Sequence, residues 1–524
     1  MDLKTRAGTG KGRKSAVSRC KGTKMEKTAI SLGRDDRLPA WCMSLAIGVF
    51  FSIVVALMCR HGADISDSDT LSYLRFSQTN RLADLPVHHG VGYAIFLKIC
   101  SLFFEDYNPM TALGNTVCGF LFATLLTRWF LAAFGKEGLL GACAVLANSA
   151  ILEVYARAMS EGLFLLALVL GTMGLSKWWN TRNGMWILIS GLATGVACLT
   201  RYAGVPFACC FALCLWRGEN GGKRGLCLGG VYLGLSLAGL CGVLLAHHLL
   251  AGTATNRLFG IHWVGPFQLG LGATTLVSWL MPDRVWLGIP HLPFVVSAAI
   301  LLFCSLALVL GWRLGKPQRT LWSVSILAYI LFLFISYSLF DSDIHFYHRM
   351  LSPIVPFLFF GLADMLSEVS QKFRWIGWLV FSCWIALGIQ RACPMVSRRF
   401  REGSGWGSLA WNQSATIHAV EHLPKSIKVY SNASGLLAWR GIANVDGIVF
   451  WQRPATEMEN PGFAEAYGRM LDELRNGRAC LVNFPACVWM KRTVPFERIV
   501  ADAGLDKLAE YEDGSIWGQP GILE

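Results

Sequence analysis

Charge is what this 524-residue sequence has least of. Only 15% of its residues are Asp, Glu, Lys or Arg, whereas soluble domains carry about 25%. Hydrophobic residues make up 54%, and the mean hydropathy is +0.45. This composition excludes a soluble globular protein and predicts a mostly α-helical, polytopic membrane protein.

Several chemical signatures are also missing. No G-x-G-x-x-G, P-loop or H-E-x-x-H pattern occurs, so soluble nucleotide chemistry is unsupported. No cysteine pair has zinc-finger spacing, and most of the 17 cysteines lie in apolar runs, where Cys behaves as a small hydrophobe. Cys480 and Cys487 could form a disulfide if the end of the chain lies outside the cytoplasm.

The net charge of +13 does not indicate a nucleic-acid partner, because it is concentrated at one end. Residues 1–37 hold eleven Lys and Arg against four Asp and Glu. The segment has no apolar periodicity and is not a signal peptide, since the apolar run after it is too long and lacks a clear cleavage site. We predict that residues 1–38 form a disordered cytoplasmic tail that obeys the positive-inside rule.

Apolar runs long enough to form or contribute to membrane helices recur along the chain. They are residues 40–58, 91–104, 110–134, 138–152, 162–179, 185–200, 202–216, 225–250, 292–312, 321–340, 350–363 and 375–389.

Counting every run as a crossing would place the basic turns 177–182 and 217–224 outside, against the positive-inside rule. The run 91–104 is short and carries Lys98, so we expect it to lie on the exoplasmic surface. About eleven spans then remain, residues 39–391 form the membrane module, and 60–109 is its first exoplasmic loop. The arginines at 391, 398, 399 and 401 would then be exoplasmic, which disagrees with the positive-inside rule. Charges at the start of a long translocated domain have less influence on orientation, however.

The composition changes near residue 392. Residues 427–430, 448–451 and 479–484 are typical of short strands, and 461–478 of an amphipathic helix. We predict that residues 392–524 form a small exoplasmic α/β domain.

The first polar loop gathers Asp64, Asp67 and Asp69 within six residues. Asp69 and Tyr73 are four residues apart and share one face of a helix. A carboxylate beside a membrane and near basic groups is a candidate general base, and Asp69 is favoured over the other two. The alternative is that all three are helix caps and solvated turn residues.

Two further charges adjoin apolar runs. Arg201 interrupts residues 185–216 near their midpoint, where a central arginine in one helix would cost about 2.5–3.5 kcal/mol. A helical hairpin with Arg201 at its exoplasmic turn avoids that cost and suits a lipid phosphate; a snorkelling arginine is the alternative. Glu161 opens a span and either complements the helix dipole or belongs to a site. His348 and Arg349 are candidate anion ligands or interfacial anchors.

These stretches resemble a family, the GT-C superfamily of membrane glycosyltransferases. Within it, the pattern is most similar to protein O-mannosyltransferases, aminoarabinose lipid A transferases and their bacterial relatives. The matching stretches run in order through Asp69-Thr-Leu-Ser-Tyr73, His88-His89-Gly-Val-Gly-Tyr93, Ala156-Arg-Ala-Met-Ser-Glu161, the glycine-containing span 191–201 that ends in Arg201, and His348-Arg-Met-Leu-Ser-Pro-Ile-Val-Pro356. The family's two prolines after the first histidine are missing here.

The resemblance implies transfer of a sugar from a polyprenyl-phosphate donor, with inversion, to a glycolipid, polysaccharide or protein acceptor on the exoplasmic face of the inner membrane. It implies Asp69 as base, with Asp67 and Glu161 as further catalytic candidates. Donor phosphate would bind Arg201, Arg349 and His348. The acceptor would contact Tyr73, His88, His89 and Tyr93. No metal or other cofactor is required, although the three aspartates leave a divalent cation possible.

Two other functions stay open. A transporter or flippase of lipid-linked sugars would share the basic and aromatic features, but it predicts internal repeats, and the sequence has no convincing repeat. A non-catalytic envelope assembly protein is the third reading.

The topology can be tested by cysteine labelling from outside the membrane. A cysteine at Glu105 should react with an impermeant reagent, and a cysteine at Lys136 should not, because the run 91–104 does not cross. The reverse labelling pattern would contradict the surface placement of that run.

Overall fold

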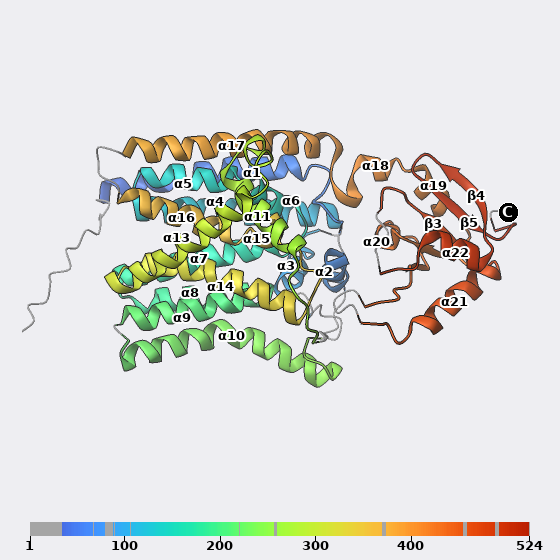
Figure 1. The fold of residues 1–524 in the computed structure, drawn as a ribbon, viewed down its shortest axis with the longest axis horizontal. Helices are drawn as coiled ribbons and strands as arrows, with labels where there is room; N and C mark the ends of the chain where they lie inside the picture. The colour runs from blue at the N-terminus through green and yellow to red at the C-terminus, as the bar shows by residue number, and fades with distance from the viewer. Residues whose placement is uncertain are drawn as a thin grey trace, which may run out of the picture. The chain divides into compact units, whose positions relative to one another are not determined.

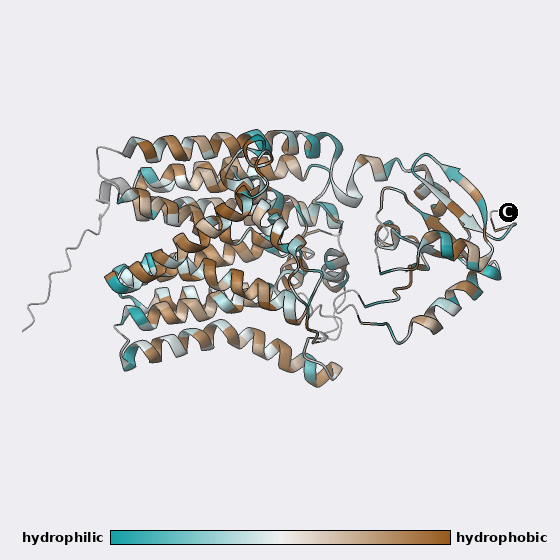
Figure 2. Cartoon of the chain, in the orientation of Figure 1, coloured by the Kyte–Doolittle hydropathy of each residue, from teal (hydrophilic) through white to brown (hydrophobic). Residues whose placement is uncertain are grey.

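We describe the chain from a computed structural model, over residues 34–522 except 67, 79–86, 88–89, 105, 220, 256–258, 369–373, 454–457 and 488–491. Its dominant feature is a bundle of apolar helices (Figures 1 and 2). Among the described residues, seven helices are long and apolar enough to cross a membrane. They are α1 (Arg34–Met58), α4 (Tyr107–Phe134), α7 (Glu161–Thr181), α10 (Lys223–Ala251), α13 (Leu292–Leu314), α14 (Pro317–Leu339) and α17 (Arg374–Glu402).

Four further apolar segments complete the bundle. Helices α5 (Glu137–Ala147) and α6 (Ser149–Ala156) meet at an angle of 56°, where the side chain of Asn148 accepts a hydrogen bond from the Ala150 amide and caps α6. The three shorter apolar helices are α8 (Gly184–Thr200), α9 (Gly204–Gly218) and α16 (Ile354–Ser367). Each of the eleven predicted crossings overlaps one of these segments, of which seven helices, or eight spans with the bent pair, are long and apolar enough to cross among the described residues.

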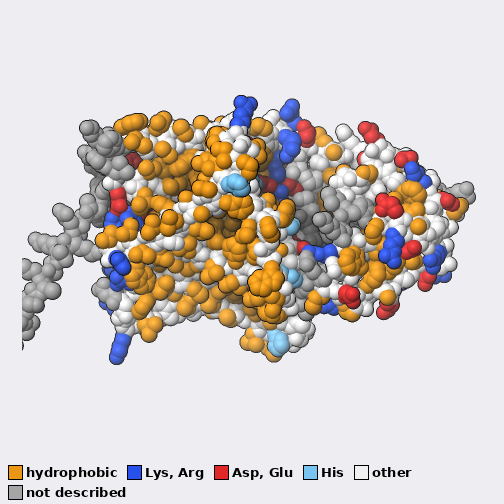
Figure 3. All heavy atoms as spheres, in the orientation of Figure 1, with side chains coloured by type: hydrophobic (Ala, Val, Ile, Leu, Met, Phe, Trp, Pro, Cys, Tyr) orange, Lys and Arg blue, Asp and Glu red, His pale blue; other side chains and the backbone are white. Residues whose placement is uncertain are grey.

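Hydrophobic side chains cover most of the visible flank of the bundle (Figure 3). Such a surface is stable in hydrocarbon and unstable in water, so the chain is a multi-pass membrane protein. Inside the bundle, aromatic rings pack closely. The rings of Trp129 on α4 and Phe360 on α16 stack with centroids 4.2 Å apart, and Trp322 on α14 is fully buried.

The first polar loop contains two short helices, α2 (Ser68–Gln78) and α3 (Gly92–Cys100). With nine residues, α3 is roughly 14 Å long, less than half of a hydrocarbon core. Its Tyr93, Ala94 and Leu97 are buried, whereas Ile95 and Ile99 are exposed. A helix of this length is too short to cross the bilayer by itself, and its placement on the exoplasmic surface stays a prediction.

Two helices between α10 and α13 were not predicted, α11 (Pro266–Leu280) and α12 (Asp283–Trp286). A four-residue helix, α15 (His348–Leu351), precedes α16. Helix α17 runs to Glu402, beyond the predicted domain boundary at residue 391. At that boundary, the Arg391 side chain donates hydrogen bonds to the Met281 carbonyl at 2.8 Å and to Asp283 at 2.5 Å.

The C-terminal part contains one mixed sheet with the strand order β2-β1-β3-β5-β4. Strand β1 pairs in parallel with β2 and β3, and β5 pairs antiparallel to β3 and β4. The strands are β1 (Lys428–Ser431), β2 (Val445–Gly447), β3 (Ala479–Asn483), β4 (Asp506–Tyr511) and β5 (Gly514–Gly518). The helices are α18 (Leu409–Asn412), α19 (Ala415–Glu421), α20 (Ser434–Trp439), α21 (Phe463–Arg475) and α22 (Phe496–Ala503), preceded by the 3-10 turn η3 (Gly405–Gly407).

Strands β1 and β3 and helix α21 lie where the sequence predicted them. The predicted strand at 448–451 is wrong, because β2 ends at Gly447 and Phe450 forms only an isolated bridge to Thr493. The thiols of Cys480 and Cys487 are both free.

The packing of α16 on α14 can be tested at Gly361. A Cβ atom there would lie 2.7–2.9 Å from three ring atoms of buried Trp322. We expect Gly361→Ala to lose about 1–3 kcal/mol of stability through overpacking, seen as a lower thermal midpoint in detergent. Gly242→Ala on α10, where nothing lies within 4 Å, is the matched control. Equal midpoints for the two variants would contradict the packing.

Candidate active site

A buried carboxylate begins helix α7. Glu161 is the first residue of that helix and is 2% exposed. An acidic residue in the first turn complements the helix dipole, but a buried charge is costly unless it is paired. Its Oε1 atom accepts hydrogen bonds from Nη1 of Arg201 and, at 2.5 Å, from Nε of Arg349. The two guanidinium groups therefore make this burial possible.

Arg201 lies where the helical hairpin was predicted, in the break between α8 and α9. Its backbone is extended, with φ −150° and ψ 139°. Nη1 also donates to the Ser160 hydroxyl at 3.1 Å, and Nη2 donates to the Met350 sulfur at 3.4 Å. A thioether is a weak acceptor, so a stronger acceptor such as a phosphate oxygen can displace it from this N–H.

Arg349, on α15, connects Glu161 to the first polar loop. Its Nη2 donates to Oδ2 of Asp69 at 3.4 Å, and Asp69 lies in the first turn of α2. Asp69, Glu161, Arg201 and Arg349 form what we call the ion cluster. Its members come from four separate segments of the chain, and its formal charges cancel.

Tyr73, one helical turn beyond Asp69 on α2, packs against Tyr93 on α3. Their rings meet edge to face with centroids 5.3 Å apart, and both side chains are buried. Burial raises the pKa of Tyr73 well above its ordinary value. Tyr73 is therefore a neutral hydrogen-bonding group at physiological pH.

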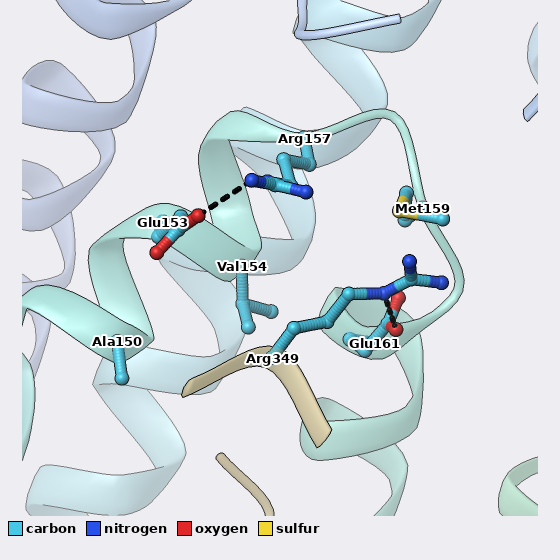
Figure 4. Close-up of a pocket in the computed structure, with 7 residues that line it drawn as sticks. All are labelled: Ala150, Glu153, Val154, Arg157, Met159, Glu161 and Arg349. Carbon is cyan, nitrogen blue, oxygen red and sulfur yellow. Dashed lines mark hydrogen bonds and ion pairs between the residues drawn. The ribbon is translucent and has the colours of Figure 1, made fainter. Parts of the chain in front are cut away.

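A small, tightly packed pocket lies beside the ion cluster. Glu161 and Arg349 line one side, and Glu153 and Arg157, joined by a 2.7 Å hydrogen bond, line another (Figure 4). Met159 also lines it. The second carboxylate oxygen of Glu161, Oε2, is buried and has no hydrogen-bond partner among the described residues.

Another predicted site residue, His348, contacts α11. The Nδ1 atom of His348 accepts a hydrogen bond of 3.1 Å from the Trp279 indole on α11, and the charges of Glu153, Arg391 and Asp283 act on this ring. Asp67, His88 and His89 lie outside the described residues.

The flanks of the histidine pair are described. The Tyr202 hydroxyl, beside Arg201, donates to the Val87 carbonyl. Gly90 has φ +100°, and a Cβ atom there would lie 2.5 Å from the Thr200 carbonyl oxygen. Both flanks therefore contact the α8–α9 break.

Across the described part of the chain, no group of three or more His, Cys, Asp or Glu side chains is arranged to hold a metal ion. The donors that gather at the site are instead guanidinium groups, which suit an anion with several oxygen atoms.

No protein-family model and no curated protein sequence matches the chain. Solved structures do match it. ArnT from Cupriavidus metallidurans in the apo state is 12% identical, with a TM-score of 0.57 over 91% of this chain and 98% of that one. ArnT bound to undecaprenyl phosphate gives 12% identity and a TM-score of 0.54, covering 92% and 98% of the two chains. The chain has the GT-C fold.

Within this GT-C fold, the sequence predicted all four members of the ion cluster. It missed Ser160 and Met350, which contact Arg201, and Trp279, which contacts His348. These three side chains carry no charge, and nothing in their local sequence distinguishes them from other membrane-helix residues.

The state of His348 gives a pH prediction. Burial lowers the pKa of His348 below the ordinary value of 6.5. As the pH falls, the unfolded chain therefore takes up a proton on this side chain at a higher pH than the folded chain does. Stability should therefore fall as the pH drops below about 6.5, by roughly 1.4 kcal/mol for each unit of pKa difference. Thermal midpoints measured from pH 7.5 to 5 should show a smaller fall in His348→Gln. An identical fall in both proteins would contradict this.

Proposed function

We propose that the chain is a membrane glycosyltransferase. It transfers a sugar from a polyprenyl-phosphate donor to a glycolipid, polysaccharide or protein acceptor of the cell envelope. Transfer takes place on the exoplasmic face of the inner membrane, with inversion at the anomeric carbon. The N-terminus is cytoplasmic and the C-terminal domain is exoplasmic.

The observation that carries this proposal is the ion cluster. Two arginines from different helices converge on one buried carboxylate, with a second carboxylate, Asp69, within hydrogen-bond reach of Arg349. Fixed positive charge is what a departing phosphate needs, and electrostatic stabilisation of this preorganised kind often lowers the barrier more than any other effect in an enzyme. The structural likeness to ArnT, which has been solved with undecaprenyl phosphate, supports the same class of donor.

In this mechanism Asp69 accepts the proton of the acceptor hydroxyl as its oxygen bonds to the anomeric carbon. The bond between that carbon and the phosphate oxygen breaks, and its electron pair leaves with the lipid phosphate. Arg201 and Arg349 stabilise the negative charge that develops on the leaving phosphate. Arg349 contacts both Asp69 and Glu161, so phosphate bound to it would lie beside the base.

Glu161 has two tasks in this proposal. Its Oε1 holds both guanidinium groups in place before the donor arrives. Its Oε2, which lacks a partner among the described residues, accepts a hydrogen bond from a substrate hydroxyl. Tyr73, Tyr93, His88 and His89 contribute to the acceptor side, and Asp67 is a second candidate base.

The assigned base can be tested with Asp69→Asn. We expect sugar transfer in reconstituted vesicles to fall by about 10²–10⁴-fold, the usual contribution of a general base. Binding of polyprenyl phosphate should persist, because both arginines remain. Asp506→Asn, at an exposed position on β4, is the control and should transfer normally.

Undiminished transfer by Asp69→Asn would rule out Asp69 as the base. If the wild-type protein moved a lipid-linked sugar across the vesicle membrane without forming a new glycosidic product, the flippase reading would replace this proposal. Mass spectrometry of envelope glycolipids and glycoproteins with and without the protein would identify the sugar and the acceptor.

A further inference from the structure

The turn that follows α1 is fastened to the segment that precedes Glu161. The Asp64 amide donates to the Ala156 carbonyl at 2.9 Å, and the Ala158 amide donates to the Asp64 carbonyl at 3.0 Å. Farther along, the Thr70 hydroxyl donates to the Ala158 carbonyl at 3.1 Å. Asp69 lies between these attachments at residues 64 and 70, and Glu161 lies three residues after the segment to which both are tied.

The same turn is held from another side by the end of α17 and the residues after it. Nη2 of Arg399 donates to Oδ2 of Asp64 at 3.2 Å, and the Ser404 hydroxyl donates to the same oxygen at 2.8 Å. The Trp406 amide donates to the Ile65 carbonyl at 2.9 Å. We call these contacts of Asp64 and Ile65 with residues 399–406 the Asp64 clamp.

The clamp includes a close approach that only glycine permits. Gly405 has φ +62°, and a Cβ atom at this position would overlap Oδ1 of Asp64 and lie 2.8 Å from the backbone nitrogen and oxygen of Ile65. The chain after α17 therefore lies directly against the turn, with no room for a side chain between them.

Stability alone does not account for such an arrangement. Asp64 and Arg399 are each 6% exposed, and the cost of desolvating a buried ion pair offsets much or all of its Coulomb attraction. A buried pair of this kind does fix geometry, because each partner tolerates few other positions. Here the geometry that it fixes is that of the loop carrying Asp69.

We propose that Asp64 is a positioning residue, which sets the location of Asp69 relative to Glu161 through the Asp64 clamp. This role rests on the proposed glycosyltransferase function. Asp64 touches neither substrate in this scheme. It acts through the turn at 61–65 and the segment at 156–158, and residues 399–406 hold it there.

Gly405→Ala tests the clamp with a matched control. The substitution pushes against Asp64 and Ile65 and places alanine at φ +62°. Gly504→Ala, in the C-terminal sheet domain, places alanine at the same φ of +62°, with nothing within 4 Å. A difference between the two variants therefore reports the clamp rather than backbone strain.

We expect kcat for sugar transfer to fall by about 10²-fold in Gly405→Ala, the order of loss caused by a misplacement of about 1 Å at a reacting group. The KM for the donor should change little, because Arg201 and Arg349 lie outside the clamp. Gly504→Ala should keep its kcat. A rise in KM at unchanged kcat, or equal kcat losses in the two variants, would overturn the proposal.

Hydrogen exchange gives a readout that does not depend on activity. Amides in residues 64–77 and 156–160 should exchange faster in Gly405→Ala than in Gly504→Ala, whether or not the wild-type protein transfers sugar. If the wild type is inactive but this difference appears, the clamp stands and the proposed function fails. If transfer is active and exchange is the same in both variants, the clamp fails and the function stands.

Discussion

The architecture of the site depends on one interaction, the pairing of the buried Glu161 carboxylate with two guanidinium groups. Removing one partner of a buried ion pair typically costs about 3–5 kcal/mol, because the remaining charge is left in a poor solvent. This pairing therefore holds together three segments that are distant in sequence: the start of α7, the α8–α9 break and α15. Asp69 joins them through Arg349 and balances the formal charge.

The sequence identified charged residues as candidate site residues where they lie next to apolar runs. Arg201 and Glu161 adjoin apolar runs, and such placements cost free energy unless a site requires them. The Asp64–Arg399 contact could not be predicted in this way, because it joins residues 335 positions apart and each lies in a locally polar stretch. Helix α11 was not predicted either, although with 15 residues it is as long as α9.

The C-terminal sheet shows the same division. Strands β1 and β3 have buried, mostly apolar sequences and were predicted. The β4–β5 hairpin was not, because Asp506–Tyr511 carries three charged residues in six and contains no buried residue. The run 448–451 is apolar without being a strand: Ile448 is buried in one cluster with Tyr430 and Leu481, whereas Trp451 is exposed. Many activities share one fold, so the proposed glycosyltransferase function depends on the ion cluster and not on the fold alone.

The two helices that flank Arg201 are shorter than a membrane is thick. Helix α8 has 17 residues and α9 has 15, which is roughly 26 and 23 Å, against a hydrocarbon core of about 30 Å. Helices with such a mismatch thin the bilayer around them or end below its surface. If the proposed function holds, the guanidinium of Arg201 would lie below the bilayer surface, and a lipid phosphate would reach it by sinking slightly below its neighbours rather than by leaving the membrane.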